Sequence, residues 1–163
     1  MTNYHPLANQ IVQILKENKC WYETFEHEPV RTSEEAAKIR TDYTLEQGAK
    51  ALIIRIKTLD KEKFFVMLVF PAHMKFDKEK VLELFSAKDI RFMTVEELSS
   101  LSEGLEPGGV PPFGNLLDLK VVADKSLFDR EKIIFNAGDR GFSVAMKSED
   151  YRELVEPQVE EIT

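Results

Sequence analysis

Apolar residues near the start of the chain follow a helical spacing. The residues that repeat every three to four positions are Leu7, Ile11, Ile14 and Leu15. This spacing predicts an amphipathic helix over about residues 5–18. In "WYETFEH" (21–27) aromatic and polar residues alternate, which is typical of a short strand. Thr32 and Glu35 then form a capping box, which predicts a short helix in "SEEAAKIR" (33–40).

Two apolar runs in the middle of the chain predict paired strands. They are "KALIIRIKT" (50–58) and "KFFVMLVF" (63–70), and the polar "LDKE" between them favours a β-hairpin. Side chains two residues apart share one face of a strand. One face of the first run therefore reads Lys, Leu, Ile, Ile at positions 50, 52, 54 and 56.

Helix caps and short strands alternate in the second half. Asp77 is expected to cap a helix that runs to about Phe85, and Thr94 with Glu97 forms a second capping box. Ser148 is expected to cap a last helix, "EDYRELV". Three short strands are predicted in "LKVVAD" (119–124), "KIIFNA" (132–137) and "GFSVAM" (141–146). Helices and strands interleave without a regular βαβ order, so we expect an α+β or mixed α/β domain with a curved, largely antiparallel or mixed sheet.

Length and composition fit one domain that spans residues 1–163. A chain of this size buries roughly two-thirds of its unfolded surface around a single core. Its 43% apolar and 31% charged residues are ordinary for a globular protein. The longest apolar run, Phe64 to Phe70, is too short for a membrane span, and the start of the chain shows no signal peptide. A single cysteine, Cys20, fits a cytoplasmic protein.

The net charge of −7 argues at first against a nucleic-acid partner. Residues 149–163 carry six acids and one arginine, a net −5, which leaves −2 for the other 148 residues. A basic face is therefore compatible with the composition, and Lys50, Arg55 and Lys57 are close in sequence. Scattered, solvated charges are the alternative.

Several catalytic and metal-binding motifs are absent from the sequence. His5, His27 and His73 lack the spacing of a zinc site, and the single cysteine adds no second ligand. There is no GxSxG elbow, GxxxxGK[ST] loop or GxGxxG fingerprint. We therefore expect neither a metal nor a cofactor, and His27 is expected at a strand end with a local hydrogen bond.

The stretch "GGVPPFG" (108–114) combines the most permissive and the most restricted backbone positions. The prolines carry no N–H and force extended geometry on the residue before each of them. Gly108 and Gly109 accept positive φ, so their amides and that of Val110 can face one side as an anion site or oxyanion hole. A proline-stiffened surface turn is the alternative.

Two further features bear on a site. An ammonium at Lys50, beside the apolar wall of its strand, would favour a negative charge or a polarised carbonyl. A lysine whose stem packs while its head stays in water is the alternative. "FNAGDRG" (135–141) offers a polar turn between two strands, or simply the Asn and Gly that a hairpin connection needs.

Three stretches in order, "FEHEPVRTSEEAA" (25–37), "GAKALII" (48–54) and "GGVPPFG…FNAGDRG" (108–141), resemble the YbaK-type aminoacyl-tRNA deacylases. These are relatives of the editing domain of bacterial prolyl-tRNA synthetases. The likeness spans about residues 20–155, and "DKSL" (124–127) is similar to a D-x-S-L sequence of the family. It implies a compact α/β domain with a mixed, barrel-like sheet flanked by helices. It also implies a cytoplasmic enzyme that hydrolyses the ester of a mischarged aminoacyl-tRNA.

The resemblance also implies roles for particular residues. Lys50 matches the functional lysine of the family, and Gly108 to Pro112 match its Gly-x-x-x-Pro loop, so Lys50, Gly108, Gly109 and Val110 are the catalytic candidates. Water or a substrate group would attack the ester, without a metal or a covalent enzyme intermediate. The residues assigned to substrate binding are Phe25, His27, Pro112, Phe113, Asn136, Gly138 and Ser143.

Phe25, Asn136 and Ser143 differ from residues of some relatives, so the edited amino acid stays open, with Ala, Cys, Ser and Thr as the plausible acyl groups. The partners implied are the tRNA 3′ end and a synthetase. A non-catalytic module that binds a small anionic ligand or a synthetase is the second hypothesis, which the net acidity favours. A hydrolase of small esters is the third.

Overall fold

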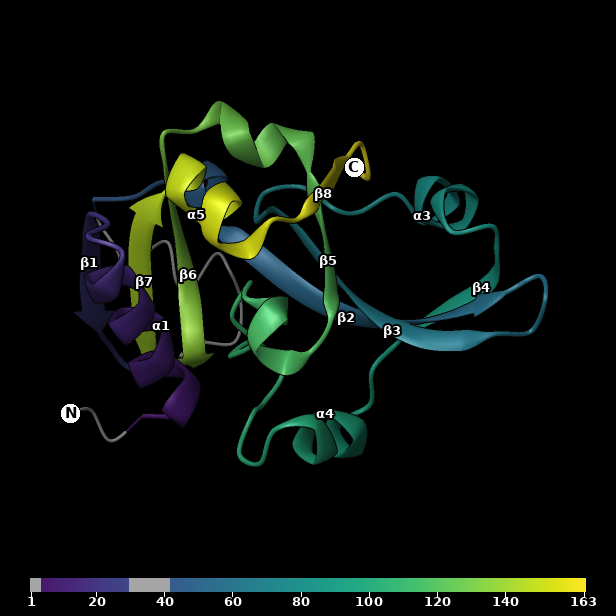
Figure 1. Cartoon of the computed structure of the whole chain (residues 1–163), viewed down its shortest axis with the longest axis horizontal. Coiled ribbons are helices and arrows are strands. Elements are labelled where there is room, and N and C mark those ends of the chain that lie inside the picture. Colours follow the sequence, from purple (N-terminus) through teal and green to yellow (C-terminus); the bar gives the residue numbers. More distant parts are fainter. Residues whose placement is uncertain (1–3, 30–41) are drawn as a thin grey trace.

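The computed structural model describes residues 4–29 and 42–163, and within them eight strands form two sheets with four α-helices around them (Figure 1). One sheet has the strand order β1-β7-β6 and the other β4-β2-β3-β5-β8. The strands of the first sheet are β1 (Tyr22–Glu26), β7 (Phe142–Lys147) and β6 (Lys132–Asp139). Those of the second are β4 (Ala87–Phe92), β2 (Ala49–Thr58), β3 (Lys63–Pro71), β5 (Lys120–Asp124) and β8 (Gln158–Glu160). The mixed α/β class is confirmed.

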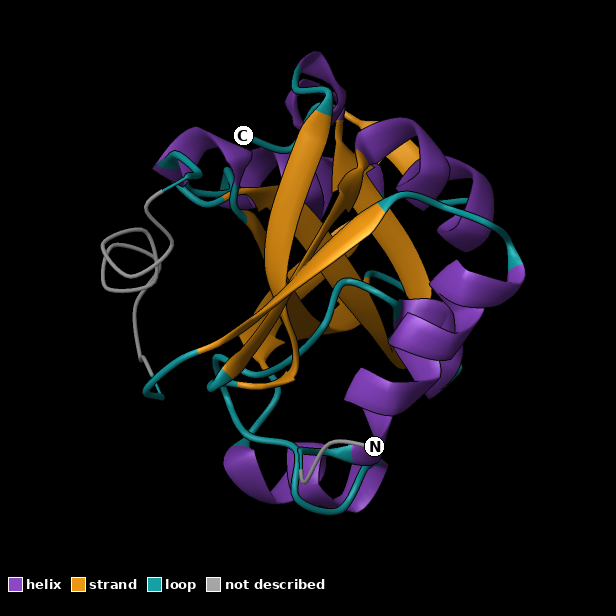
Figure 2. Cartoon of the chain, turned by 90° about the vertical axis from the view of Figure 1, so that its left-hand side faces the viewer, coloured by secondary structure: helices purple, strands orange, loops and turns teal. Residues whose placement is uncertain are grey.

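The sheets combine antiparallel and parallel pairs. β2 and β3 form the expected antiparallel hairpin, whereas β3–β5 and β5–β8 are parallel. The expected barrel-like closure is not found among the described residues. The two sheets meet there at one isolated parallel bridge, between Gly48 and Ile134, because β2 turns away to pair with β3 and β4. Figure 2 shows the strands crossing in the middle with helices outside them.

The helices begin at caps that the sequence largely predicts. They are α1 (Pro6–Glu17), α3 (Lys78–Leu84), α4 (Val95–Leu101) and α5 (Ser148–Val155). Asp77 accepts from two amides of α3, and Thr94 and Glu97 close the expected box at α4. The expectation for Ser148 is wrong, since Lys147 is the N-cap and the Ser148 hydroxyl donates to the Arg130 carbonyl at 2.5 Å. The helix expected at 33–40 lies outside the described residues.

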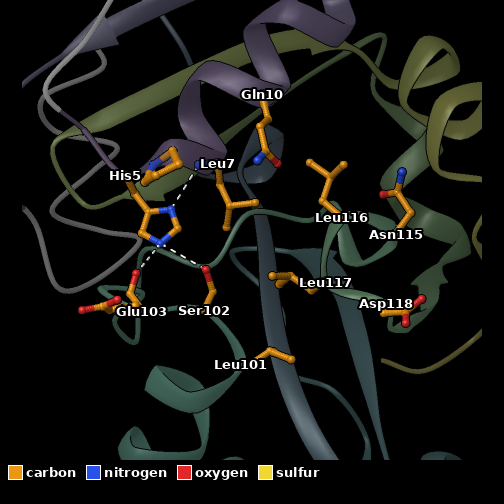
Figure 3. Close-up of a pocket in the computed structure, with 11 residues that line it drawn as sticks. His5, Leu7, Gln10, Leu101, Ser102, Glu103, Asn115, Leu116, Leu117 and Asp118 are labelled. Atoms are coloured by element: carbon orange, nitrogen blue, oxygen red, sulfur yellow. Dashed lines mark hydrogen bonds between the residues drawn. The ribbon is translucent and has the colours of Figure 1, made fainter.

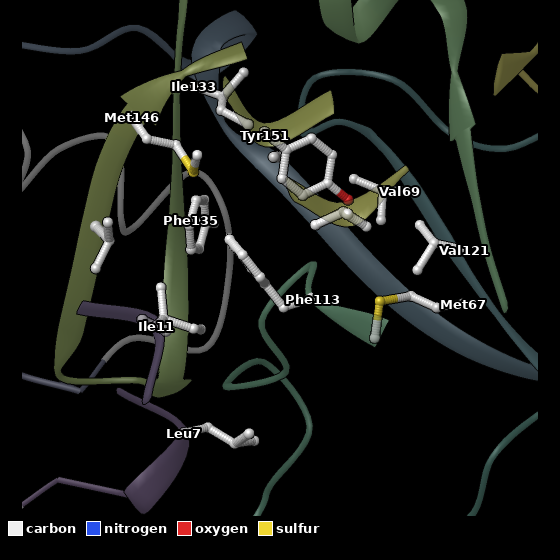
Figure 4. Close-up of a cluster of buried hydrophobic side chains, with 14 of the residues drawn as sticks. Leu7, Ile11, Met67, Val69, Phe113, Val121, Ile133, Phe135, Met146 and Tyr151 are labelled. Carbon is white, nitrogen blue, oxygen red and sulfur yellow. The ribbon is translucent and has the colours of Figure 1, made fainter. Parts of the chain in front are cut away.

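The main core lies between α1 and the facing sides of the two sheets (Figure 4). Each layer contributes apolar side chains to it, among them Leu7, Ile11, Met67, Val69, Phe113, Val121, Ile133, Phe135, Met146 and Tyr151. A second cluster packs on the other face of the five-stranded sheet, where Ile54 and Ile56 of β2 meet Val81 of α3. Because alternate residues of β2 enter different clusters, its two faces are both largely covered.

The end of the chain is held by a buried aspartate in "DKSL". Asp124 is 1% exposed, and its Oδ1 accepts from the amides of Ile162 at 2.8 Å and Thr163 at 3.2 Å. Its second oxygen accepts from the Ser126 amide. The D-x-S-L sequence therefore has a structural role here. Across 4–29 and 42–163, the helices lack the length and apolar character needed to cross a membrane.

Candidate functional site

Three of the predicted site residues lie in one row across β1, β7 and β6. Ser143 is directly opposite Phe25 on one side and Asn136 on the other. Residues directly opposite in neighbouring strands share a face of the sheet. Since Ile133 and Phe135 of β6 point into the main core, Asn136 and its row lie on the other face. The structure thus brings together residues that are up to 118 positions apart.

A chain of side-chain hydrogen bonds crosses this face and reaches the glycine-proline loop. His27 Nε2 lies 2.8 Å from Ser143 Oγ. The Ser143 hydroxyl donates to Asn136 Oδ1 at 3.1 Å, and Asn136 Nδ2 donates to the Gly108 carbonyl at 2.6 Å. Ser143 is fully buried, while His27 and Asn136 are half-buried. Four predicted site residues are therefore connected to one another.

The loop itself is held at both ends. Gly108 has φ +87°, a conformation that favours glycine. The Gly109 amide donates to the Glu106 carbonyl at 3.0 Å, so this predicted donor is already used within the loop. The amides of Gly108 and Val110 remain, and neither donates to a main-chain carbonyl in the described part of the chain. These two are therefore the better candidates for contacting a ligand.

The Pro112 end of the loop is held by a tyrosine that was not predicted from the sequence. Tyr151 of α5 is fully buried, and its hydroxyl donates to the Pro112 carbonyl at 2.6 Å. Burial raises the pKa of this phenol, which keeps it a neutral donor. A tyrosine on the buried face of a helix needs a partner for its hydroxyl, and this was the available signal.

Two residues expected to bind substrate lie in the protein interior instead. Phe113 has no exposed surface, and its ring packs 5.7 Å from those of Phe135 and Tyr151. Gly138 has φ +94° and sits under α1, where an added Cβ would lie 3.0 Å from that of Leu7. The Phe113 ring therefore packs in the main core, whereas Gly138, although buried, also lines a small cavity with Gly109 and Arg140.

Lys50 is exposed at the start of β2, beside the point where the two sheets meet. Gly48 forms the isolated parallel bridge with Ile134, so Lys50 follows this bridge by two residues on β2, as Asn136 does on β6. Ala49 belongs to the main core, which turns the next residue, Lys50, to the opposite face. Asn136 likewise points away from the main core on β6. Arg55 and Lys57 alternate to the other side of β2, so the three cations do not form one basic face.

An aromatic cluster borders the same face. Phe25 packs edge-on against Tyr43 with ring centroids 5.7 Å apart, and both belong to a small cluster that also contains Ile134 and Ala145. The Tyr43 hydroxyl donates to Glu23 at 2.6 Å, and burial, together with this carboxylate, raises the pKa of the phenol. These side chains give the face an apolar floor beside its polar chain. No cluster of three potential metal-binding side chains occurs within the described ranges.

A separate cavity of about 630 Å³ opens between the start of α1 and the end of α4 (Figure 3). His5 stands at its edge, where Nδ1 accepts from the Leu7 amide and Nε2 lies 2.9 Å from the Glu103 carbonyl. Its described lining contains none of the predicted site residues. We therefore place the candidate site on the face of Asn136 and Lys50 and not in this cavity.

Comparisons with known proteins match most of the chain to one family. Residues 27–154 match the model of the aminoacyl-tRNA editing domain family. The "Multifunctional Ser/Thr-tRNA deacylase ProXp-y" of Escherichia coli K12 is 29% identical over 151 residues, 92% of this chain and 89% of that protein. The "Prolyl-tRNA editing protein ProX" of Acetoanaerobium sticklandii is 28% identical over 149 residues, 89% of this chain and 88% of that protein.

The fold is shared with a solved structure described as a candidate trans-editing enzyme for prolyl tRNA synthetase. The TM-score is 0.79 at 21% identity, and the likeness covers 99% of each chain. At that identity the comparison shows the fold alone. The family model covers most of the sequence, including the loop, Lys50 and Asn136. The chain belongs to the aminoacyl-tRNA editing domain family.

Proposed function

We propose that this protein is a trans-editing deacylase, which hydrolyses the ester between a wrong amino acid and the 3′-terminal adenosine of a tRNA. Family membership supports the reaction class. The single structural observation that carries the assignment is the 2.6 Å hydrogen bond from Asn136 to Gly108. It attaches the glycine-proline loop to β6, the strand that Gly48, two residues before Lys50, contacts at the isolated bridge.

The loop is suited to stabilise the charge that ester hydrolysis creates. Attack on the ester carbonyl builds negative charge on its oxygen, and a fixed main-chain N–H pointing at that oxygen contributes about 3 kcal/mol, or about 100-fold in rate. The amides of Gly108 and Val110 are the donors we assign to this role. Because both belong to a braced loop, little reorganisation accompanies the reaction.

Lys50 is suited to bind the substrate by charge. Its exposed ammonium would contact the terminal phosphate or the ester end of the tRNA. Water, or a hydroxyl of the substrate, is the nucleophile in this scheme. The oxygen of the nucleophile bonds to the acyl carbon while the bond from that carbon to the ribose oxygen breaks. The ribose oxygen takes up the proton that the nucleophile loses and leaves as a free hydroxyl.

A relative among the synthetases and the nature of the proposed substrate support the partner and the compartment that we propose. A "Proline--tRNA ligase" of Sulfurihydrogenibium sp. is 34% identical over 93 residues, which are 57% of this chain and 15% of that protein. We infer that a synthetase is a partner of the free-standing domain. Since its substrate would be charged tRNA, we place the protein in the cytoplasm, as one domain over residues 1–163.

The test is a deacylation panel. Purified protein is incubated with tRNAs carrying Ala, Cys, Ser or Thr, and the loss of the ester is followed in time. We expect hydrolysis of at least one mischarged tRNA well above the spontaneous rate. If every aminoacyl-tRNA remains intact while the protein is folded and binds a small anion or a synthetase, the non-catalytic alternative is correct. Turnover of a minimal aminoacyl ester without salt-dependent tRNA affinity would indicate a small-ester hydrolase.

A further inference from the structure

The hydrogen bonds of Asn136 point to a role different from substrate contact. We propose that Asn136 is a positioning residue for the glycine-proline loop, and that Ser143, bonded to His27, sets the orientation of its amide. This inference rests on the proposed function, in which the loop donates to the reacting ester. In this proposal the hydrogen-bonded side chains on β1, β7 and β6 hold the loop in place and do not contact the amino acid of the substrate.

The orientation of the Asn136 amide is fixed by its two partners. A main-chain carbonyl can only accept, so the nitrogen of the Asn136 amide must face Gly108. The amide oxygen then faces Ser143 and can only accept, so the Ser143 hydroxyl hydrogen is used there. His27 Nδ1 lies 2.9 Å from the Glu28 carbonyl, and Nε2 of the same ring lies 2.8 Å from Ser143 Oγ. Gly108 and Ser143 together thus fix which way the Asn136 amide points.

The hydrogen bond of Asn136 holds one peptide unit of the glycine-proline loop. The peptide unit between Gly108 and Gly109 is bound on both sides, its carbonyl by Asn136 and its N–H by the Glu106 carbonyl. Two successive glycines are the least restricted backbone in the loop. Fixing this peptide unit sets the direction in which the neighbouring amide of Val110 points. Asn136 is the side chain that supplies this restraint.

Asn136 lies at an irregular position of its strand. The β6–β7 ladder shifts its register between Asn136 and Asp139, and irregularities of this kind redirect side chains at functional sites. Both polar atoms of Asn136 already have protein partners, Gly108 and Ser143. In this arrangement Asn136 acts on the substrate through the loop that it holds, and the kcat and KM readouts below test this.

The experiment is a double-mutant cycle of Asn136→Ala and Ser143→Ala with two readouts. The first is steady-state deacylation of the tRNA that the wild type hydrolyses best. The second is hydrogen exchange of the Gly109 amide, which reports loop order without any substrate. Asn115→Ala, an exposed residue outside the site, is the matched control. Thermal unfolding checks that each variant is folded. Asn136→Asp, which has the same size but no side-chain donor, replaces Asn136→Ala if that variant does not fold, and Ser143→Cys likewise replaces Ser143→Ala.

We expect Asn136→Ala to lower kcat about tenfold while KM stays within about twofold. Ser143→Ala should lower kcat less, and the double variant should be no slower than Asn136→Ala, because Ser143 acts through Asn136. The Gly109 amide should exchange faster in all three variants, and Asn115→Ala should match the wild type.

Three results would overturn the proposal. A rise in KM with unchanged kcat would make Asn136 a substrate-binding residue. Independent, multiplicative effects in the cycle would remove the coupling to Ser143, and unchanged exchange at Gly109 would remove the restraint on the loop. If the wild type hydrolyses no aminoacyl-tRNA, the proposed function fails. The exchange measurement still decides whether Asn136 holds the loop.

Discussion

Removing the Tyr151 hydroxyl tests whether the loop depends on the core beneath it. In Tyr151→Phe the ring keeps its edge-on contact with Phe113, at 5.7 Å and 80°, while the Pro112 carbonyl loses its donor at 2.6 Å. A buried carbonyl left without a partner costs about 1–3 kcal/mol. In a chain of this length that corresponds to a fall in Tm of about 2–12 °C. Because the carbonyl belongs to the loop, the deacylation rate should also fall, by about two- to tenfold.

Thermal unfolding followed by circular dichroism gives the first number, and single-turnover deacylation gives the second. Tyr22→Phe, which removes a hydroxyl from a half-buried tyrosine of β1, is the matched control and should change stability by less than about 0.5 kcal/mol. If Tyr151→Phe unfolds like the wild type, the hydroxyl does not hold the loop. If stability falls but the rate does not, Tyr151 supports the fold alone.

Three further predictions concern stability. The Arg91 guanidinium lowers the pKa of Glu97 from 4.5 to about 2, so its carboxylate stabilises the fold above pH 4.5 and loses this effect as the pH falls toward 2. The difference in the free energy of unfolding between wild type and Glu97→Gln, measured in urea, should therefore fall to zero over that range. A difference that stays constant with pH would refute the ion pair. Gly138→Ala should destabilise by about 1–3 kcal/mol, because φ is +94° and the new Cβ meets Leu7, and an unchanged Tm would contradict this. His5→Ala, which removes the N-cap of α1, should cost about 1 kcal/mol by thermal unfolding, whereas His5→Asn should cost less.

Local structure could be predicted from the sequence wherever one pattern dominated. The 3.6-residue spacing around Ile11 gave α1 to within one residue at each end, and the capping residues Asp77 and Thr94 gave the starts of α3 and α4. Strand β4 was missed because "AKDIRF" mixes charged and apolar residues and shows no regular alternation. The segment is a strand because it pairs with β2, which is a tertiary effect that the local sequence does not encode.

The site was only partly predictable, because side-chain direction depends on which face each strand buries. Lys50 and Lys57 are seven residues apart in one strand and therefore emerge on opposite faces, which their nearness in sequence concealed. Phe113 follows two prolines in a polar loop, yet its ring fills the core. The hydrogen bonds that link His27 to Asn136 pass through Ser143, which is 116 positions from His27 in sequence. Local patterns do not encode the strand pairing that brings these residues together.

The most direct test of the account is the deacylation rate of Lys50→Ala on the mischarged tRNA that the wild type hydrolyses fastest. Lys57→Ala, on the same strand but the opposite face, removes the same charge and serves as the control. We expect Lys50→Ala to be at least about tenfold slower and Lys57→Ala to stay within about twofold of the wild type. Equal rates for Lys50→Ala and the wild type would contradict a site built from Lys50 and the glycine-proline loop.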